Sequence, residues 1–275
     1  MLDYPPETKE ELLAALKNIE AWESEQKDLW FLEKLGRLPF QLLDRWTPRI
    51  VQKKIGEAIN ELGSYIQSGG KYLVSKQNVF KLLQHHLSAS AKQNEPTLTL
   101  TAISSLPLTV MDRAADSLSQ KSSKLAALQG ATTGFGGLFT LAVDIPAVLG
   151  MSLKAIQELA VCYGFDPDEK QERIFAVKCL QFASSDIVGK QAILEDLAGF
   201  DDGDEQSHII SQLQGWREVV QAYRDNFGWK KLFQLIPVAG MLFGAIINRG
   251  TLQDVAEAAR MMYRKRRVLE RISRL

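Results

Sequence analysis

The sequence predicts an all-α protein, a multi-helix bundle with a central glycine-rich apolar helical hairpin. Apolar residues recur with helical spacing along most of the chain, and no segment alternates as a half-buried strand would. The hairpin is predicted from residues 125–164, which carry no charge from Leu125 to Val143, then meet Asp144 and continue with a second apolar run. The 275 residues are enough to bury a sizeable core, in one large domain or two small ones.

Composition narrows the class of protein. Acidic and basic residues number 33 each, so the overall charge directs the chain neither to nucleic acid nor to an anionic surface. The two cysteines, Cys162 and Cys179, form no CxxC pair, so we expect reduced and buried thiols. The first residues contain no basic stretch followed by an apolar one, so we expect no cleaved signal peptide and a cytoplasmic protein.

The first hundred residues are predicted to form amphipathic helices. Thr8 and Glu11 have the spacing of a capping box and predict the start of the first helix. Thr47-Pro48 predicts the start of a second helix, which Gly69-Gly70 ends. Ser75 is expected to cap a shorter third helix.

A polar, threonine-rich segment, 88–101, is expected to be a loop. It divides the chain into N-terminal amphipathic helices, 1–100, and a second helical domain, 101–275. The alternative is that both parts belong to one domain.

The second half begins with a helix that Pro107 opens and that leads into the hairpin. After the hairpin, the segment Asp166-Pro167-Asp168-Glu169 predicts a helix start, because it places a cap residue before a first-turn proline. A second apolar block without a charge follows at Leu232–Ile247. Thr251 is expected to restart a helix that reaches the end of the chain.

Both apolar blocks contain glycines four residues apart, at Gly130 and Gly134 and at Gly240 and Gly244. This spacing lets helix backbones approach closely, within a membrane or within a water-soluble core. The second block is short for a bilayer-spanning helix, and the first is polar for its length. Stable spanning, shallow insertion and burial in a bundle therefore remain alternatives. In each case we expect the two glycine segments to cross one another.

Asp144 with Pro146 is typical of a helix start, in which the aspartate caps and the proline lies in the first turn. The alternative is functional, because Glu158 falls on the same helix face as Asp144, with Lys154 one turn before it. Polar groups inside an apolar bundle are costly unless they are paired, so such a cluster is a candidate site. The candidate polar cluster consists of Asp144, Glu158, Arg173 and Asn248.

The last helix carries a run of basic residues that follows the second apolar block closely. Most charge runs are solvated faces, but polybasic segments near a membrane are attracted to anionic lipid. We therefore expect a basic, lipid-facing patch made of Arg260, Arg264, Lys265, Arg266, Arg267 and Arg271. Nucleic acid is not expected as a partner, since no RNP or KH motif and no aromatic platform accompanies the patch.

No catalytic, cofactor or metal signature is found. The sequence lacks a phosphate-binding P-loop, a GxGxxG after a strand, a GxSxG elbow and a HExxH pair. His85 and His86 are adjacent and cannot point the same way on a helix, and the acidic segment 199–205 lacks the pattern of a calcium loop. We therefore expect no cofactor, no metal and a non-enzymatic protein, with an unfamiliar enzyme as the alternative.

Two blocks, residues 130–173 and 236–266, together resemble the bacterial EcsC family. The resemblance covers roughly the second half of the chain and implies an all-helical protein whose gene lies near that of an ABC transporter, without an established activity. The residues that carry it are Gly134, Gly136, Gly137, Asp144, Pro146, Glu158, Tyr163, Gly164, Glu172, Arg173, Pro237, Gly240, Gly244, Asn248, Ala259 and Tyr263.

Two hypotheses on function follow. The first is a membrane-associated helical protein, peripheral to or partly inserted in the cell membrane, whose partner is the lipid surface or a membrane protein such as an ABC transporter. The second is a soluble helical enzyme or small-ligand binder with a buried polar cluster around Asp144 and Glu158.

Overall fold

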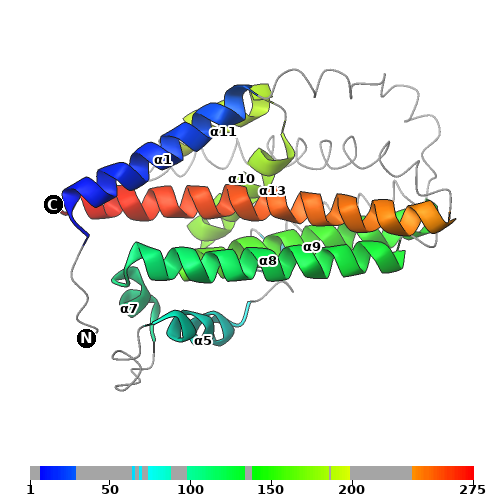
Figure 1. Ribbon diagram of the computed structural model, residues 1–275, viewed down its shortest axis with the longest axis horizontal. Coiled ribbons are helices and arrows are strands. Elements are labelled where there is room, and N and C mark those ends of the chain that lie inside the picture. Colours follow the sequence, from blue (N-terminus) through cyan, green and yellow to red (C-terminus); the bar gives the residue numbers. More distant parts are fainter. Residues whose placement is uncertain are drawn as a thin grey trace.

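The computed structural model is an all-α helical bundle, which confirms the predicted fold class (Figure 1). It describes residues 7–28, 64–65, 68–69, 74–87, 98–133, 138–185, 187–198 and 237–275. The helices in this part of the chain are α1 (Lys9–Asp28), α5 (Lys76–His86), α7 (Leu100–Ser104), α8 (Leu108–Thr133), α9 (Leu138–Cys162), α10 (Lys170–Ser184), α11 (Ile187–Ala198) and α13 (Pro237–Ile272).

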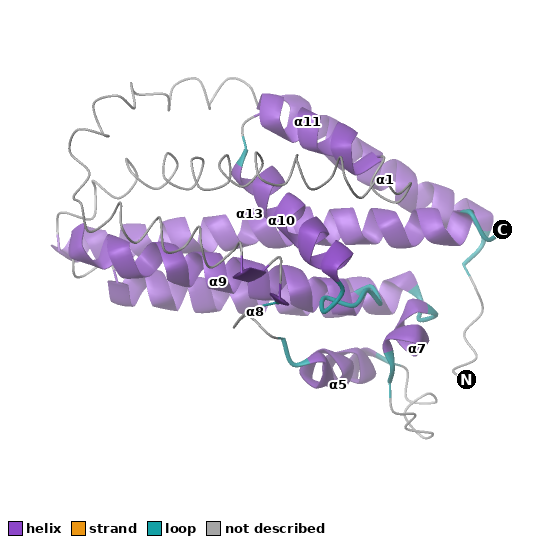
Figure 2. Ribbon diagram, turned by 180° about the vertical axis from the view of Figure 1, so that it is seen from behind, coloured by secondary structure: helices purple, strands orange, loops and turns teal. Residues whose placement is uncertain are grey.

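Three long helices, α8, α9 and α13, lie side by side at the centre of the bundle (Figures 1 and 2). Helices α8 and α13 are antiparallel, because residues late in α13 meet residues early in α8. The contacts that fix this pairing are Arg264 with Asp112, Arg260 with Asp116, and Asn248 with Gln129.

Helix α9 is also antiparallel to α8, since the Tyr163 hydroxyl just after α9 donates a hydrogen bond to Asp112 near the start of α8, at 2.7 Å. The end of α8 and the starts of α9 and α13 therefore lie together at one end of the bundle, which we call the distal end. The C-terminus lies at the opposite, proximal end (Figure 1). Helix α1 packs on α13, and α5 packs on both α8 and α9.

Several helix starts follow the local signals in the sequence. The capping box at α1 is confirmed, because the Glu11 carboxylate accepts the Thr8 backbone N–H at 2.8 Å and the Thr8 hydroxyl accepts the Glu11 N–H at 3.2 Å. Helix α8 begins directly after Pro107, as predicted. Helix α5 begins after Ser75, although the Ser75 side chain makes no capping hydrogen bond.

Three predicted starts are wrong. Helix α10 has Glu169 as its N-cap, because the Asp166 carboxylate instead accepts the Asp168 N–H in the preceding turn. Helix α9 runs without interruption through Asp144 and Pro146, so this pair does not begin a helix. Helix α13 likewise continues through Thr251.

Tertiary packing explains why α9 and α13 continue. After Pro146, the side chains of Val148, Leu149 and Leu153 are buried, so this face is held against its neighbours. In α13 the buried Leu252 and Val255 have the same effect. Burial of a continuous helix face outweighs the local cost of proline or glycine.

Some predictions fall outside the described residues, namely the second amphipathic helix after Thr47-Pro48 and the acidic segment 199–205. The domain boundary near residue 100 stays a prediction. None of the helices described above combines the length and apolarity needed to cross a bilayer.

Candidate functional site

Basic side chains of α13 form ion pairs and hydrogen bonds with residues of other helices. The Arg264 Nε donates to both carboxylate oxygens of Asp112 at 3.1 Å, and the Tyr163 hydroxyl donates to the same carboxylate. Burial raises the pKa of Tyr163 well above its ordinary value, so this hydroxyl keeps its proton and remains a donor. Asp112 thereby joins α8, α9 and α13, and Arg260 pairs with Asp116 along the same seam.

Arg266 lies between two aromatic rings and a buried acid. Its guanidinium carbon is 4.3 Å from the ring centroid of Phe165 and 4.4 Å from that of Phe175, and Nη1 donates to the Glu172 carboxylate at 2.9 Å. The Glu172 side chain is buried, so breaking this ion pair would remove a favourable interaction from a site with little access to water. This contact joins α10 to α13.

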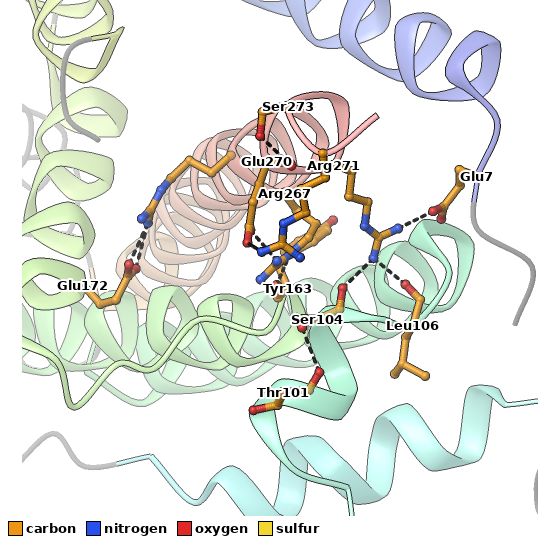
Figure 3. A network of polar contacts seen from close by, with 12 residues as sticks. Glu7, Thr101, Ser104, Leu106, Tyr163, Glu172, Arg267, Glu270, Arg271 and Ser273 are labelled. Atoms are coloured by element: carbon orange, nitrogen blue, oxygen red, sulfur yellow. Dashed lines mark hydrogen bonds and ion pairs between the residues drawn. The ribbon is translucent and has the colours of Figure 1, made fainter. Parts of the chain in front are cut away.

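At the proximal end, two arginines of α13 hold the carboxyl ends of other helices (Figure 3). The Arg267 Nε donates to the Tyr163 carbonyl, just after α9, at 2.8 Å. The Arg271 Nη2 donates to the carbonyl of Ser104, the last residue of α7, at 2.9 Å and to that of Leu106, just after this helix, at 2.6 Å. Carbonyls at helix ends lack helical partners and carry partial negative charge, so cations stabilise them. Burial lowers the pKa of Arg267 to about 10, so it is charged at neutral pH.

Glu7 completes this junction. Its Oε2 accepts from Arg271 at 2.5 Å, and its Oε1 accepts the backbone N–H of Leu108, in the first turn of α8, at 2.7 Å. A carboxylate is favourable at a helix N-terminus, where N–H groups are unpaired. A residue before α1 therefore caps α8 and pairs with α13.

Gly164 lets the chain turn at this junction. Its φ of 79° is in the left-handed region, and a Cβ here would lie 2.9 Å from the Ser104 backbone. Glycine therefore permits both the end of α9 and its close approach to α7.

The predicted basic patch thus has partners within the bundle. Lys265 completes the set, because its Nζ donates to the Glu23 carboxylate of α1 at 2.7 Å. Contact of these six cations with lipid stays a prediction, and lipid would have to compete with the carboxylates and carbonyls that lie beside them.

The members of the candidate polar cluster have different partners. Glu158 in α9 pairs with Lys154 at 3.9 Å, Arg173 in α10 donates to the Asp168 carbonyl, and Asn248 in α13 donates to Gln129 at 3.1 Å. The side chain of Asp144 lies outside the described part of the chain. The single cluster remains a prediction.

Sequence reasoning missed the buried contacts of Arg266. Glu172 appears in the sequence only among the residues that carry the family resemblance, and its partner Arg266 is 94 positions away. No local signal could have paired Glu172 with Arg266.

The glycine crossing is only partly described. Gly130 is buried in α8, and Gly240 and Gly244 belong to α13, but their surroundings in α13 are not described, and neither is Gly134. The contact of Asn248 with Gln129 places the flanking residues of the two segments side by side. The crossing itself stays a prediction.

The distal end carries exposed apolar side chains. Leu128 of α8 is 66% exposed, Leu125 of α8 is 47% exposed and Ile246 of α13 is 65% exposed. Two exposed cations lie next to them in the sequence, Lys124 on α8 and Arg249 on α13. We call these five residues the distal surface. Two more exposed cations, Lys121 on α8 and Lys154 on α9, lie closer to the middle of the bundle.

A metal site and a reactive cysteine are not supported in the described residues. No group of three histidine, cysteine or acidic side chains with metal-binding geometry occurs in the described ranges. Cys162 and Cys179 are buried, as expected, and burial raises the pKa of both thiols, so they are not activated nucleophiles.

Comparison with known proteins gives a consistent family. The profile described as "EcsC protein family" matches residues 14–268, well beyond the half in which the resemblance was seen. "Uncharacterized protein YdbA" of Bacillus subtilis (strain 168) is 53% identical over 268 residues, which are 98% of this chain and 97% of that protein. "Protein EcsC" of the same organism is 35% identical over 143 residues, 52% of this chain and 58% of that protein. No solved structure matches.

Proposed function

The chain belongs to the EcsC protein family, and because this membership supplies no reaction, we propose from the distal surface that the protein is a peripheral membrane protein. It acts by contact with the bilayer at the cytoplasmic face, with its distal end partly inserted. The observation that carries this proposal is the exposure of Leu125, Leu128 and Ile246 at that end.

Exposed apolar side chains that gather at one place on a protein mark contact sites. The three residues belong to the two apolar blocks of the sequence, and these blocks reach the same end of the bundle because α8 and α13 are antiparallel. The sequence around them contains no charge from Leu125 to Val143 and from Leu232 to Ile247. Three other exposed leucines, Leu13, Leu269 and Leu275, instead have charged residues close to them in the sequence. The distal end therefore combines exposed apolar side chains with long uncharged sequence.

The cations of the distal surface favour an anionic bilayer over a purely apolar partner. Basic residues near a membrane are attracted to anionic lipid by about 1 kcal/mol each. The apolar residues also come from two helices, α8 and α13, rather than from one groove. Lipid can surround an inserted end and contact apolar residues on both helices, whereas a groove of a partner protein would contact only one face.

Flotation with vesicles tests the proposal. The intact protein is expected to float with vesicles that contain phosphatidylglycerol and to bind less to vesicles of phosphatidylcholine alone. Leu128→Ser should weaken binding on the order of tenfold, because an exposed leucine loses its transfer into lipid.

Leu275→Ser is the matched control, because Leu275 is 69% exposed but lies at the proximal end. Its binding should equal that of the unmodified protein. If the intact protein stays unbound with anionic vesicles at low ionic strength, or if both leucine variants bind equally well, the proposal is refuted.

A further inference from the structure

One face of α8 combines cations with exposed apolar residues. Lys121, Lys124, Leu125 and Leu128 are spaced three and four residues apart, so they share one side of the helix. The opposite side of α8 carries buried residues such as Ala126, toward the centre of the bundle. The four exposed residues therefore face away from α13.

Helix α9 extends this face. Lys154 and Glu158 are one turn apart, and the charge of Lys121 on α8 acts on the Glu158 carboxyl, which places Lys121 on the same side of the helix pair. Helix α5 packs against α8 and α9 toward the proximal end, where His86 contacts Ser117, one turn before Lys121 (Figure 1). Beyond α5, Lys121, Lys124, Leu125, Leu128 and Lys154 are exposed. We call these five residues the outer face.

Glu158 is an acid among the lysines of the outer face. Its side chain is only 13% exposed, and its pairing with Lys154 at 3.9 Å is loose. A lysine that precedes a glutamate by four residues is also the less favourable order on a helix. Burial raises the pKa of Glu158, while Lys154 on its own helix and Lys121 on α8 oppose that shift; in the described residues these two are the charged groups that act on it.

We propose that the outer face is the surface that binds anionic lipid headgroups, and that Glu158 competes with the lipid for Lys121 and Lys154. This inference rests on the proposed function, since it assigns the face and the control of the same membrane contact. The ionised carboxylate attracts both lysines and adds a negative charge that repels anionic lipid. Protonation removes that charge and leaves the lysines to the headgroups.

The sign of the pH dependence follows. Because burial raises the pKa of Glu158 above the ordinary value of a glutamate, the carboxyl takes up its proton before exposed glutamates do as the pH falls. Binding to anionic vesicles is therefore expected to strengthen as the pH falls from neutral. At neutral pH, Glu158→Gln should bind more tightly than the unmodified protein, and its binding should strengthen less as the pH falls.

The experiment measures flotation of the full chain with phosphatidylglycerol vesicles at neutral pH and at about pH 5.5, still above the ordinary pKa of a glutamate. The unmodified protein is compared with Glu158→Gln and with Glu195→Gln, an exposed carboxylate on α11. Histidines also titrate in this range, so the pH dependence of the unmodified protein alone does not identify Glu158. The difference between the two glutamine variants does.

The face is tested by replacing lysines. Lys121→Gln should weaken binding roughly fivefold, and so should Lys124→Gln, as expected for loss of one cation near an anionic surface. Lys17→Gln on α1 is the control, since α1 lies on the far side of α13 from α8 (Figure 2). Thermal unfolding of each variant confirms that it is folded.

Each outcome separates this inference from the proposed function. If the unmodified protein binds anionic vesicles but Glu158→Gln keeps the same pH profile, the role of Glu158 is overturned and membrane binding stands. If Lys121→Gln and Lys124→Gln bind normally while Arg249→Gln does not, the contact lies on the α13 side and the outer face is overturned. If the unmodified protein binds at neither pH, the proposed function itself fails.

Discussion

Tyr163 and Tyr263 are both fully buried, and replacing each with phenylalanine is expected to change stability in opposite directions. The Tyr163 hydroxyl donates to Asp112 at 2.7 Å. The Tyr263 hydroxyl has no hydrogen-bond partner among the described residues. Phenylalanine keeps the ring, so the contacts of Tyr263 with Phe165 and Phe175, at centroid distances of 5.4 and 4.8 Å, are preserved. The two variants therefore isolate one oxygen atom each.

The magnitudes follow from these surroundings. A hydrogen bond to a charged group contributes about 1.5 to 3 kcal/mol, and Asp112 keeps Arg264 after the change, so Tyr163→Phe should lower the free energy of unfolding by about 2 kcal/mol. A buried hydroxyl without a partner costs about 1 to 3 kcal/mol. Tyr263→Phe removes that cost. The free energy of unfolding should stay unchanged or rise by about 1 kcal/mol, because the space that the hydroxyl filled is left empty and this offsets part of the gain.

Urea unfolding measures both values, with the slope against urea concentration as the control for an unchanged unfolding transition. The reasoning is refuted if Tyr263→Phe is destabilised as much as Tyr163→Phe. That result would mean that the Tyr263 hydroxyl is paired and that the polar contacts of the core are arranged differently.

Two further predictions concern glycines. Gly164→Ala should lower the free energy of unfolding by about 2 kcal/mol or more, because the added Cβ meets the Ser104 backbone at 2.9 Å and φ is positive; equal thermal midpoints would contradict this geometry. Extending the pairing of α8 with α13 brings Gly244 opposite the last turn of α8, so Gly244→Leu should cost about 1 to 3 kcal/mol if the helices cross there. A higher midpoint for Gly244→Ala with no loss for Gly244→Leu would show an open face.

The sequence correctly predicted those features of the fold that depend on residues close together in the chain. Helical spacing predicted the all-α class, and the starts at Thr8 and after Pro107 have their sequence signals within one turn, although Glu7 also caps α8 from far away in the sequence. The breaks expected at Asp144 and Thr251 do not occur, because residues that follow Pro146 in α9 and residues next to Thr251 in α13 are buried against neighbouring helices. Local signals describe how a helix could begin, whereas packing decides whether it does.

The candidate site was harder to predict for the same reason. The basic run from Arg260 to Arg271 was evident, but its carboxylate partners lie in segments far away in the sequence. Arg271, for example, pairs with Glu7, and the sequence around neither residue indicates this pairing. Helical spacing is enough to group Lys121, Lys124, Leu125 and Leu128 on one face of α8. Whether that face is exposed depends on how far α5 extends along α8, which the spacing does not show.

The contacts of α13 also bear on how the chain folds during translation. The ribosome makes α13 after every element with which its cations pair, and Glu7 must wait for Arg271 before the proximal junction can close. Contacts between such distant positions slow folding, because a long loop must be closed before they form. The ion pairs of Asp112 with Arg264 and of Glu172 with Arg266 can form only after α13 emerges. The earlier helices can collapse during synthesis, but their final arrangement is reached only once α13 is complete.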